Sequence, residues 1–469
     1  MLKTFLYRKL TQNKGAPRLW LEGAQPERAG FTPGKRFMVE LDTEKKRLTL
    51  SLADTGYRVV SGKERSGKRI PVIDINSHEL LSLFKGMDSV RVIMTDNKIH
   101  ILPTVAEMRR RERLARLQAK LDAKEPIAVG SLSHGGGILS HALHKGMAAA
   151  GLSSKLEFAN DIREDLLDHA SAVNDAWNAN TIMLAAPMQE LALDQWSLKQ
   201  LPSLELFEAG IPCSGASVAG RAKLGTAVAE AHPDVGHLIV PFLQILAAVN
   251  PAVVVLENVK PYASSASMWI LRHSLRDMGY DVHETILDAA EFNELEHRER
   301  LCMVAVTRGM HFSFDDIERP ERRTRQLGEV LDPIADDDPR WSRFDYLRKH
   351  QEKHAAKGNG FAMQVFTADS DHIGTLTRGY AKIRCSDPKL AHPNEPELLR
   401  QVTATEHARC KGISDHLVAG LCSTTAHEML GQSICYAPFH ALGRLLAKAM
   451  QSGFNTETQA IPMDLLAAA

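Results

Sequence analysis

Two short apolar runs that end in polar or reactive residues constrain the fold of this chain more than any other feature. Residues 204–211 lead into Pro212-Cys213, and residues 252–256 lead into Glu257-Asn258. Such runs are typical of parallel strands buried on both faces. Because residues just past the carboxyl ends of such strands line one crevice, we expect Cys213 and Glu257 to be neighbours, as the thiol nucleophile and the acid of an enzyme. Taken singly, each has a plainer interpretation, as an inert buried thiol and a helix-capping acid.

A pair of arginines precedes a third apolar run. Arg298 and Arg300 stand at i and i+2, at the entry to the strand-like residues 301–306. On an extended segment two such side chains point the same way and offer planar donors to a carbonyl oxygen or a phosphate. Alone, this piece is more typical of a solvated charged edge, and its place after the two earlier motifs is what favours a functional role.

A glycine-rich turn further upstream has the pattern of a nucleoside-cofactor site. The strand-like run 127–129 leads through Leu132 into Gly135-Gly136-Gly137, and a helix is expected around residues 140–147. Such a turn lets a ligand approach backbone amides closely. Asp161 follows about 25 residues later, where an acid can hold both hydroxyls of a ribose. A glycine triplet by itself is more often a flexible loop.

The first 104 residues are rich in strand signals. Two hairpins are predicted, one from 36–41 and 47–52 and one from 90–94 and 99–102, so two related halves of about fifty residues are expected. Residues 1–124 hold 26 lysines and arginines against 14 acids, although the whole chain has zero formal net charge. This asymmetry is typical of a basic nucleic-acid-binding part on a more acidic body. The alternative is a β-rich dimerisation or packing module without DNA contact.

Helix-forming composition without Gly or Pro predicts one exposed helix over 105–124, with a solvated charged face and an apolar stripe that packs on a neighbour or self-associates. Residues 308–397 are charged and turn-rich, which suits a small inserted domain before the chain returns to the main sheet from Arg400 onward. A final amphipathic helix is predicted over 438–450, packed beside the cofactor domain.

Six cysteines without a Cys-x-x-Cys pair argue against a disulfide framework or a structural zinc site, so no metal is expected. No secretory signal or apolar run of membrane length is present. We therefore expect a cytoplasmic, nucleoid-associated protein with no membrane partner.

In these motifs and their order, the chain resembles the DNA (cytosine-5) methyltransferases from about Ile127 to Met450. Residues 210–217 are similar to the family's Pro-Cys-Gln-x-x-Ser nucleophile loop, 255–259 to its Glu-Asn-Val motif, and 296–300 to its Gln-x-Arg-x-Arg motif. Weaker matches are residues 400–409, residues 431–433 in place of Gly-Asn-Ser, and residues 375–382 in the target-recognition region.

The resemblance implies an α/β fold: a doubly wound class I methyltransferase sheet with an inserted small target-recognition domain and a β-rich N-terminal domain. The expected divisions are a possibly DNA-binding domain 1–104, a linker helix 105–125, a cofactor-binding catalytic domain 126–307, a target-recognition region 308–398, the C-terminal part of the catalytic domain 399–450 and a tail 451–469. Separately, residues 19–34 resemble the small AbrB-like (SymE-type) swapped-hairpin family, whose members commonly bind DNA.

The resemblance further implies methyl transfer from S-adenosyl-L-methionine to carbon 5 of a cytosine flipped out of double-stranded DNA, in the setting of restriction-modification or a mobile element. It implies that Cys213 adds to the ring, that Glu257 serves ring N3 and that Arg298 and Arg300 serve O2. The implied cofactor-binding residues are Leu132, Gly135, Gly136, Asp161, Ile162, Pro212, Gln432 and Ser433, and the implied substrate-binding residues are Ser217, Asn258 and Thr375.

Several positions depart from the family pattern. His134 replaces a glycine of the cofactor turn, residues 185–188 hold no aspartate for the adenine amine, and Ser214, Glu296 and Gln432 replace usual residues. Two alternatives therefore stay open: cytosine-5 methyl transfer to structured RNA, and a non-enzymatic DNA-binding regulator with a degenerate methyltransferase body. The N-terminal domain and the linker helix are also candidate surfaces for self-association.

Overall fold

The structure is a computed structural model that describes residues 1–212, 215, 225, 228–356, 358 and 362–454. It divides into two compact units. The N-terminal unit comprises residues 1–116 together with 277–279, and the main unit comprises residues 117–276 and 280–454. Each is described by itself.

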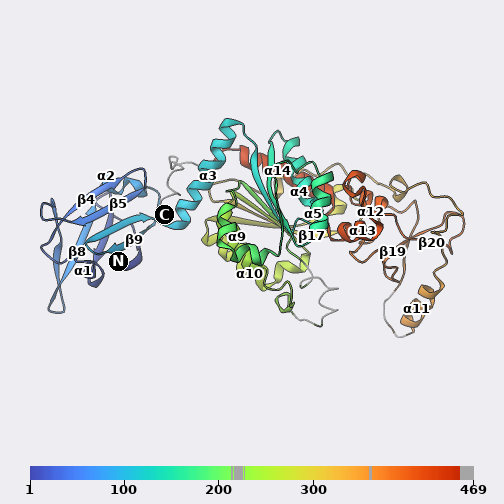
Figure 1. Cartoon of the computed structure of the whole chain (residues 1–469), viewed down its shortest axis with the longest axis horizontal. Helices are drawn as coiled ribbons and strands as arrows, with labels where there is room; N and C mark the ends of the chain where they lie inside the picture. Colours follow the sequence, from blue (N-terminus) through green and yellow to red (C-terminus); the bar gives the residue numbers. More distant parts are fainter. Residues whose placement is uncertain (213–214, 216–224, 226–227, 357, 359–361, 455–469) are drawn as a thin grey trace. The chain divides into compact units, whose positions relative to one another are not determined.

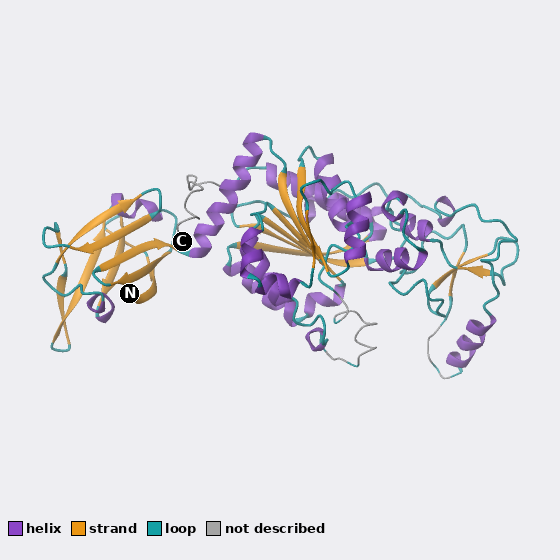
Figure 2. Cartoon of the chain, viewed as in Figure 1, coloured by secondary structure: helices purple, strands orange, loops and turns teal. Residues whose placement is uncertain are grey.

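The described residues of the N-terminal unit form two antiparallel sheets with little helix (Figure 2). One is six-stranded, in the order β1-β9-β10-β5-β4-β6, and the other is four-stranded, in the order β2-β3-β8-β7. The elements are β1 (Leu2–Lys9), β2 (Thr11–Asn13), β3 (Ala16–Glu22), α1 (Ala24–Arg28), β4 (Arg36–Asp42), β5 (Arg47–Leu52), β6 (Arg58–Val59), β7 (Ser61–Arg65), β8 (Lys68–Asn76), α2 (His78–Leu81), β9 (Ser89–Thr95) and β10 (Lys98–Pro103).

The N-terminal unit repeats one order of elements. The series β3-α1-β4-β5 is followed by the series β8-α2-β9-β10, and the two series pair through β3 with β8 and through β5 with β10, both antiparallel. Apolar side chains of both series fill one core, among them Leu19, Leu50, Ile75 and Ile99. This arrangement agrees with the two related halves predicted from the hairpins.

Helix α3 (Val105–Ala123) is less exposed than its composition predicted. Leu114 and Leu117 are buried, and the Arg113 side chain, 1% exposed, donates to the carbonyl oxygens of Met278 and Gly279 at 2.9 and 3.2 Å. The expectation of an exposed helix with a solvated charged face is therefore wrong at Arg113, because backbone carbonyls replace water around that guanidinium.

The described residues of the main unit contain a seven-stranded sheet, here called the central sheet, in the order β13-β12-β11-β14-β15-β17-β16. Strands β11 to β15 are parallel, and β17 is antiparallel to both of its neighbours. Its strands are β11 (Ile127–Leu132), β12 (Ser154–Asp161), β13 (Ile182–Ala185), β14 (Leu206–Ala209), β15 (Val253–Asn258), β16 (Tyr280–Asp288) and β17 (Glu299–Thr307).

Helices cover both faces of the central sheet, with α4, α5 and α14 on one face and α9 and α10 on the other (Figure 1). This covering explains why β14 and β15 are buried along their whole length. The helices of this unit are α4 (Ile138–Ala149), α5 (Glu164–Val173), α6 (Met188–Leu193), α7 (Gln195–Gln200), α9 (Ile239–Val249), α10 (Ala266–Asp277), α11 (Asp345–Ala355), α12 (Ala404–Cys410), α13 (Ser423–Gln432) and α14 (Tyr436–Gln451).

Two glycines let α14 pack closely on α4. A Cβ at Gly146 would lie 2.1 Å from the carbonyl oxygen of His440, and one at Gly443 would lie 2.5 Å from that of Leu143. Only residues without a side chain allow the two backbones to approach this far. The final helix thus packs on the helix that follows the glycine-rich turn, as its amphipathic pattern predicted.

Residues 308–400 form a smaller lobe of the main unit. Strands β18 (Gln364–Phe366), β19 (Pro388–Ala391) and β20 (Leu399–Arg400) make a small sheet, and Tyr380 and Leu390 lie in its core. The expected return to the main sheet at Arg400 is wrong, because Arg400 lies in β20 and pairs with Leu390 of β19. Among the described residues, the chain after Arg400 adds helices rather than strands to the main unit.

Candidate active site

The central sheet reverses its strand order between β11 and β14, and ligands of open α/β sheets bind outside the carboxyl ends of the strands at such a point. Asn258, at the end of β15, donates from Nδ2 to the carbonyl oxygen of Ile211 at 3.1 Å, and its Oδ1 accepts from the Val259 amide at 2.8 Å. The Asn258 side chain is buried and fully bonded to backbone. It therefore positions the segment that carries Pro212, and its predicted role in substrate binding stays a prediction.

Glu257 lies at the same edge. A Cβ built on Gly210 would be 3.6 Å from Glu257 Oε2, so this carboxyl adjoins the segment that leads to Pro212. Cys213 and Ser217 lie outside the described residues. Their proximity to Glu257 stays a prediction, but the described residues bring the acid to the backbone directly before the thiol.

Arg300 and burial act on Glu257 in opposite directions. Arg300 Nε lies 2.8 Å from Glu257 Oε1, which favours the carboxylate, while the side chain is almost entirely removed from water. Burial is the larger effect and raises the pKa of Glu257 above the usual value of a glutamate. A raised pKa favours the protonated carboxyl group, which can donate a hydrogen bond or a proton to a ligand.

Arg298 is placed differently from Arg300. Arg298 is buried, with 4% of the residue exposed. Its guanidinium donates to the carbonyl oxygen of Gly431 at 2.9 Å and to Glu296 Oε1 at 3.2 Å. It thereby ties the start of β17 to the residue directly before Gln432 and Ser433. Of the two predicted catalytic arginines, Arg300 forms an ion pair with Glu257, while Arg298 contacts Glu296 and Gly431, and the catalytic role of each stays a prediction.

A buried ion pair that the sequence did not reveal supports Arg298. Glu296 Oε2 lies 2.8 Å from Lys411 Nζ, and both side chains are 0% exposed. Glu296 Oε1 also accepts from the Leu376 amide at 3.3 Å. Glu296 stands where the family pattern has a glutamine, and a buried carboxylate there requires a cation nearby. That requirement was the available signal for a partner, but the sequence could not say which lysine or arginine supplies it.

The cofactor turn follows β11, and His134 does not obstruct it. His134 Nδ1 lies 2.8 Å from Ser131 Oγ, and Trp177 Nε1 donates to His134 Nε2 at 3.1 Å. Burial lowers the pKa of His134 to about 3, so the ring is neutral. The ring is therefore held inside the protein, and the doubt that His134 raised over this turn does not concern the ligand side.

Of the remaining cofactor residues of this turn, Gly135, Asp161 and Ile162 border open space, whereas Leu132 is fully buried and Gly136 packs against Met429. The Gly135 amide donates to Asp161 Oδ2 at 2.8 Å, and the space where a Gly135 Cβ would stand is empty to 4 Å. Ile162 is 70% exposed, so an apolar face is free beside the acid. These residues fit an adenosyl group, with Asp161 for the ribose and Ile162 for the base. Residues 185–188 supply no aspartate for the adenine amine, and that contact stays unassigned.

A family model described as C-5 cytosine-specific DNA methylase matches residues 127–448. The chain belongs to this family. The match covers β11 through most of α14 and leaves the residues before 127 outside it.

Curated relatives agree with this assignment. The Type II methyltransferase M1.ScrFI of Lactococcus lactis subsp. cremoris is 24% identical over 264 residues, 54% of this chain and 64% of its own. The DNA-cytosine methyltransferase of Escherichia coli K12 is 28% identical over 334 residues, 62% of this chain and 66% of its own. The chain thus spans just under two thirds of the length of these two relatives.

Solved structures share the fold. The S. pombe Dnmt2 methyltransferase superposes with a TM-score of 0.52 at 18% identity, covering 70% of this chain and 99% of that one. The Entamoeba histolytica methyltransferase EhMeth superposes with a TM-score of 0.52 at 15% identity, covering 70% and 98%. The chain therefore has a mixed α/β methyltransferase-like fold, and a β-rich N-terminal region precedes the part matched by the family.

The predicted substrate residue Thr375 contacts the segment that leads into β17 of the central sheet. Its Oγ1 donates to the carbonyl oxygen of His297 at 2.7 Å, and His297 directly precedes Arg298. Gln432 is exposed at the end of α13, and Ser433 Oγ donates to the carbonyl oxygen of Leu430 at 2.8 Å. Thr375 thus contacts the residue directly before Arg298, and Gln432 and Ser433 follow Gly431, whose carbonyl oxygen accepts from Arg298.

Two absences apply to the described part of the chain only. There, no group of three or more His, Cys, Asp or Glu side chains has the arrangement of a metal site. Across those same residues, none of the helices combines the length and the apolar character needed to cross a membrane.

Proposed function

We propose that this chain transfers a methyl group from S-adenosyl-L-methionine to carbon 5 of a cytosine in double-stranded DNA. The observation that carries the proposal is the Glu257–Arg300 pair, held at the sheet edge beside Gly210 on the segment that leads to Cys213. Family membership supplies the reaction class, and this pair supplies the acid and the cation that the reaction needs.

Cytosine carbon 5 is too electron-poor to attack a methyl sulfonium directly. The Cys213 thiolate first adds to carbon 6, which moves electron density onto ring N3 and O2. Glu257, whose pKa burial raises, is the proposed proton donor to N3, and Arg300 donates to O2. Carbon 5 then takes the methyl group, a base removes the carbon 5 proton, and the thiolate leaves as the ring regains its double bond.

Bound S-adenosyl-L-methionine supplies an electrophilic methyl group. Leu132, Gly135, Gly136, Asp161, Ile162, Pro212, Gln432 and Ser433 would hold it. Because the target carbon cannot be reached inside a duplex, the cytosine has to be flipped out of the helix. Residues 308–398 are proposed as the target-recognition region, and Ser217 and Thr375 as substrate-binding residues.

The N-terminal unit is proposed as an AbrB-like, DNA-binding module. Its β7–β8 hairpin is exposed from Ser61 to Arg69 and carries Lys63, Arg65, Lys68 and Arg69. Such a basic ribbon suits phosphate contacts. The exposed side chains of Phe5 and Tyr7 on β1, at one edge of the six-stranded sheet, are the proposed surface for self-association.

The proposal is tested by bisulfite mapping of DNA from cells that express the chain, where 5-methylcytosine in one sequence context is expected. Cys213→Ala should bind DNA and produce no methylated cytosine. A duplex that carries 5-fluorocytosine in that context should form a stable covalent adduct with the wild type only. Methylation of structured RNA with unmethylated DNA would replace the substrate, and failure to bind S-adenosyl-L-methionine would favour the regulator.

A further inference from the structure

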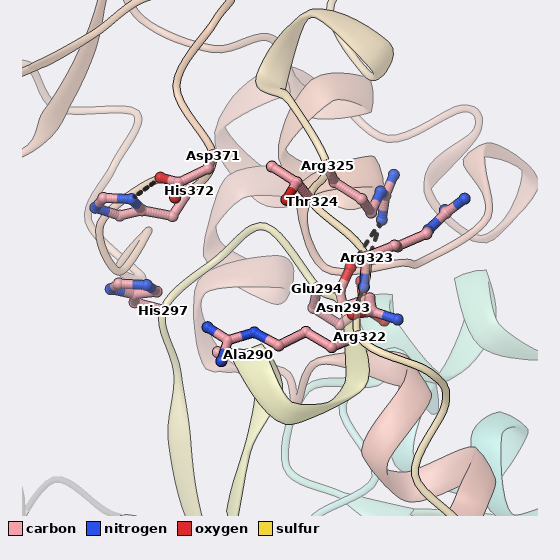
Figure 3. Close-up of a pocket in the computed structure, with 10 residues that line it drawn as sticks. All are labelled: Ala290, Asn293, Glu294, His297, Arg322, Arg323, Thr324, Arg325, Asp371 and His372. Carbon is pink, nitrogen blue, oxygen red and sulfur yellow. Dashed lines mark hydrogen bonds and ion pairs between the residues drawn. The ribbon is translucent and has the colours of Figure 1, made fainter.

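A pocket of about 140 Å³ lies beside the arginine strand, outside the groups that the proposed chemistry uses. One side comes from residues 290–297, directly before Arg298, and the other comes from residues 322–325 and 371–372 of the smaller lobe. Figure 3 shows Arg322 extending along this pocket toward His297, with the His372 ring above.

Two arginines of the pocket make no close contact with an acidic side chain among the described residues. Arg322 and Arg323 are exposed, and within the described residues neither guanidinium makes a hydrogen bond or an ion pair. Their neighbour Arg325 is different, since its Nε lies 3.3 Å from Glu329 Oε2 and its Nη1 lies 4.0 Å from Glu294 Oε2. Arg325 therefore fixes the segment, while Arg322 and Arg323 remain available for a ligand.

The pocket also holds two acids, of which Asp371 is an exposed carboxylate whose hydrogen bond with His372 lowers its pKa, while Glu294 is buried. Glu294 accepts from the Ala437 amide at 3.0 Å, and burial raises its pKa to about 7. Asp371 is mainly exposed and lies 2.7 Å from His372 Nδ1. The rings of His297 and His372 stack with centroids 4.2 Å apart and planes 10° apart. The pocket thus offers planar guanidinium donors beside imidazole edges, a combination that suits a phosphate group.

The place of the pocket identifies the source of that phosphate. His297 directly precedes Arg298, and its carbonyl oxygen accepts from Thr375 Oγ1. His372 lies on the segment that leads to Thr375. His297 precedes Arg300 by three residues, so the pocket adjoins the chain segment that carries the proposed cytosine contact. We propose that the pocket binds a backbone phosphate of the DNA through Arg322 and Arg323, an inference that rests on the proposed function.

The test measures how DNA affinity depends on salt. The probe is a fluorescently labelled mixed-sequence DNA duplex, titrated with the full chain at several salt concentrations. Loss of one phosphate contact reduces the slope of log K against log salt by about 0.9. We expect this reduction and weaker binding in Arg322→Gln/Arg323→Gln. The matched control is Lys199→Gln/Arg276→Gln, which removes two exposed charges of the main unit outside the pocket and should keep the wild-type slope.

Three results would overturn the proposal: an unchanged slope in the pocket variant, an equal change in the control, or a change seen with an RNA duplex but not with DNA. Thermal unfolding of both variants checks that the fold is kept. Arg322→Lys/Arg323→Gln keeps one positive charge in the pocket and should show a slope between those of the wild type and the pocket variant. A methyl-transfer assay on the wild type runs in parallel. A pocket-dependent slope without methyl transfer would reject the proposed function and keep the pocket, whereas methyl transfer with an unchanged slope would reject the pocket alone.

Discussion

At the scale of single residues, Glu257 is the group whose environment says most about chemistry. Its pKa is raised by burial although Arg300 is 2.8 Å away, so replacing the acid removes a proton donor and keeps the volume. Glu257→Gln should lower the single-turnover rate of methyl transfer by about 10²–10⁴-fold. The control is Glu284→Gln, which removes a carboxylate on β16 that pairs with Arg272 of α10. A rate within a few-fold of wild type would contradict the assignment of Glu257.

The buried pair of Glu296 and Lys411 makes a second prediction at this scale, concerning stability. Both side chains are 0% exposed, so Glu296→Gln leaves a lysine without a counter-charge inside the protein. Breaking such a pair costs about 3–5 kcal/mol of unfolding free energy, measured by denaturant titration. Glu296→Gln/Lys411→Met should recover most of that loss, since it removes both charges. If the double variant is no more stable than the single one, the pair does not account for the loss.

At the scale of elements, the cofactor turn depends on Gly137. Its φ is +72°, and a Cβ there would lie 2.4 Å from His134 Nε2. Gly151, after α4, has a φ of +79° with nothing within 4 Å of its Cβ position. Gly151→Ala should therefore cost about 1 kcal/mol, the strain of a left-handed alanine. Gly137→Ala should cost more and weaken S-adenosyl-L-methionine binding in calorimetry, because its methyl group would also lie 2.5 Å from Asn174 Nδ2. Equal effects of the two alanines would contradict the clash.

Helix α4 makes the protein sensitive to acid through His144. Burial lowers the pKa of His144 to about 4, against about 6.5 in an unfolded chain. Between these values the unfolded chain binds the extra proton, so stability falls as the pH falls through 6.5 and this loss levels off near 4. From pH 7 to pH 5 this residue should cost about 2 kcal/mol. His144→Gln should show a smaller decrease in unfolding free energy over that range, while the exposed His273→Gln should behave as wild type.

Sequence patterns located the elements of the main unit better than the contacts between them. The runs before Pro212 and Glu257 correspond to adjacent parallel strands, because burial on both faces leaves a local apolar pattern.

The orientation of His134 was not predictable, since Ser131 and Trp177 decide it and Trp177 is distant in sequence. Arg298 and Arg300 looked equivalent for the same reason. Their partners, Gly431 and Glu257, come from separate elements. The expected return of Arg400 to the main sheet failed because two residues suffice for β20, too few to leave a pattern.

At the scale of the whole molecule, the proposed DNA contacts lie in both units, whereas the groups proposed for methyl transfer lie in one. The N-terminal unit carries the exposed β7–β8 hairpin, while the groups proposed for methyl transfer lie in the main unit. Lys68→Gln/Arg69→Gln removes two charges that make no ion pair among the described residues. Steady-state assays at physiological salt should show KM for DNA raised by about 5–10-fold, because phosphate contacts are lost, and kcat unchanged. Binding of S-adenosyl-L-methionine without DNA should match wild type. A reduced kcat would mean that the hairpin acts on chemistry, and an unchanged KM would remove the DNA-binding role proposed for this hairpin.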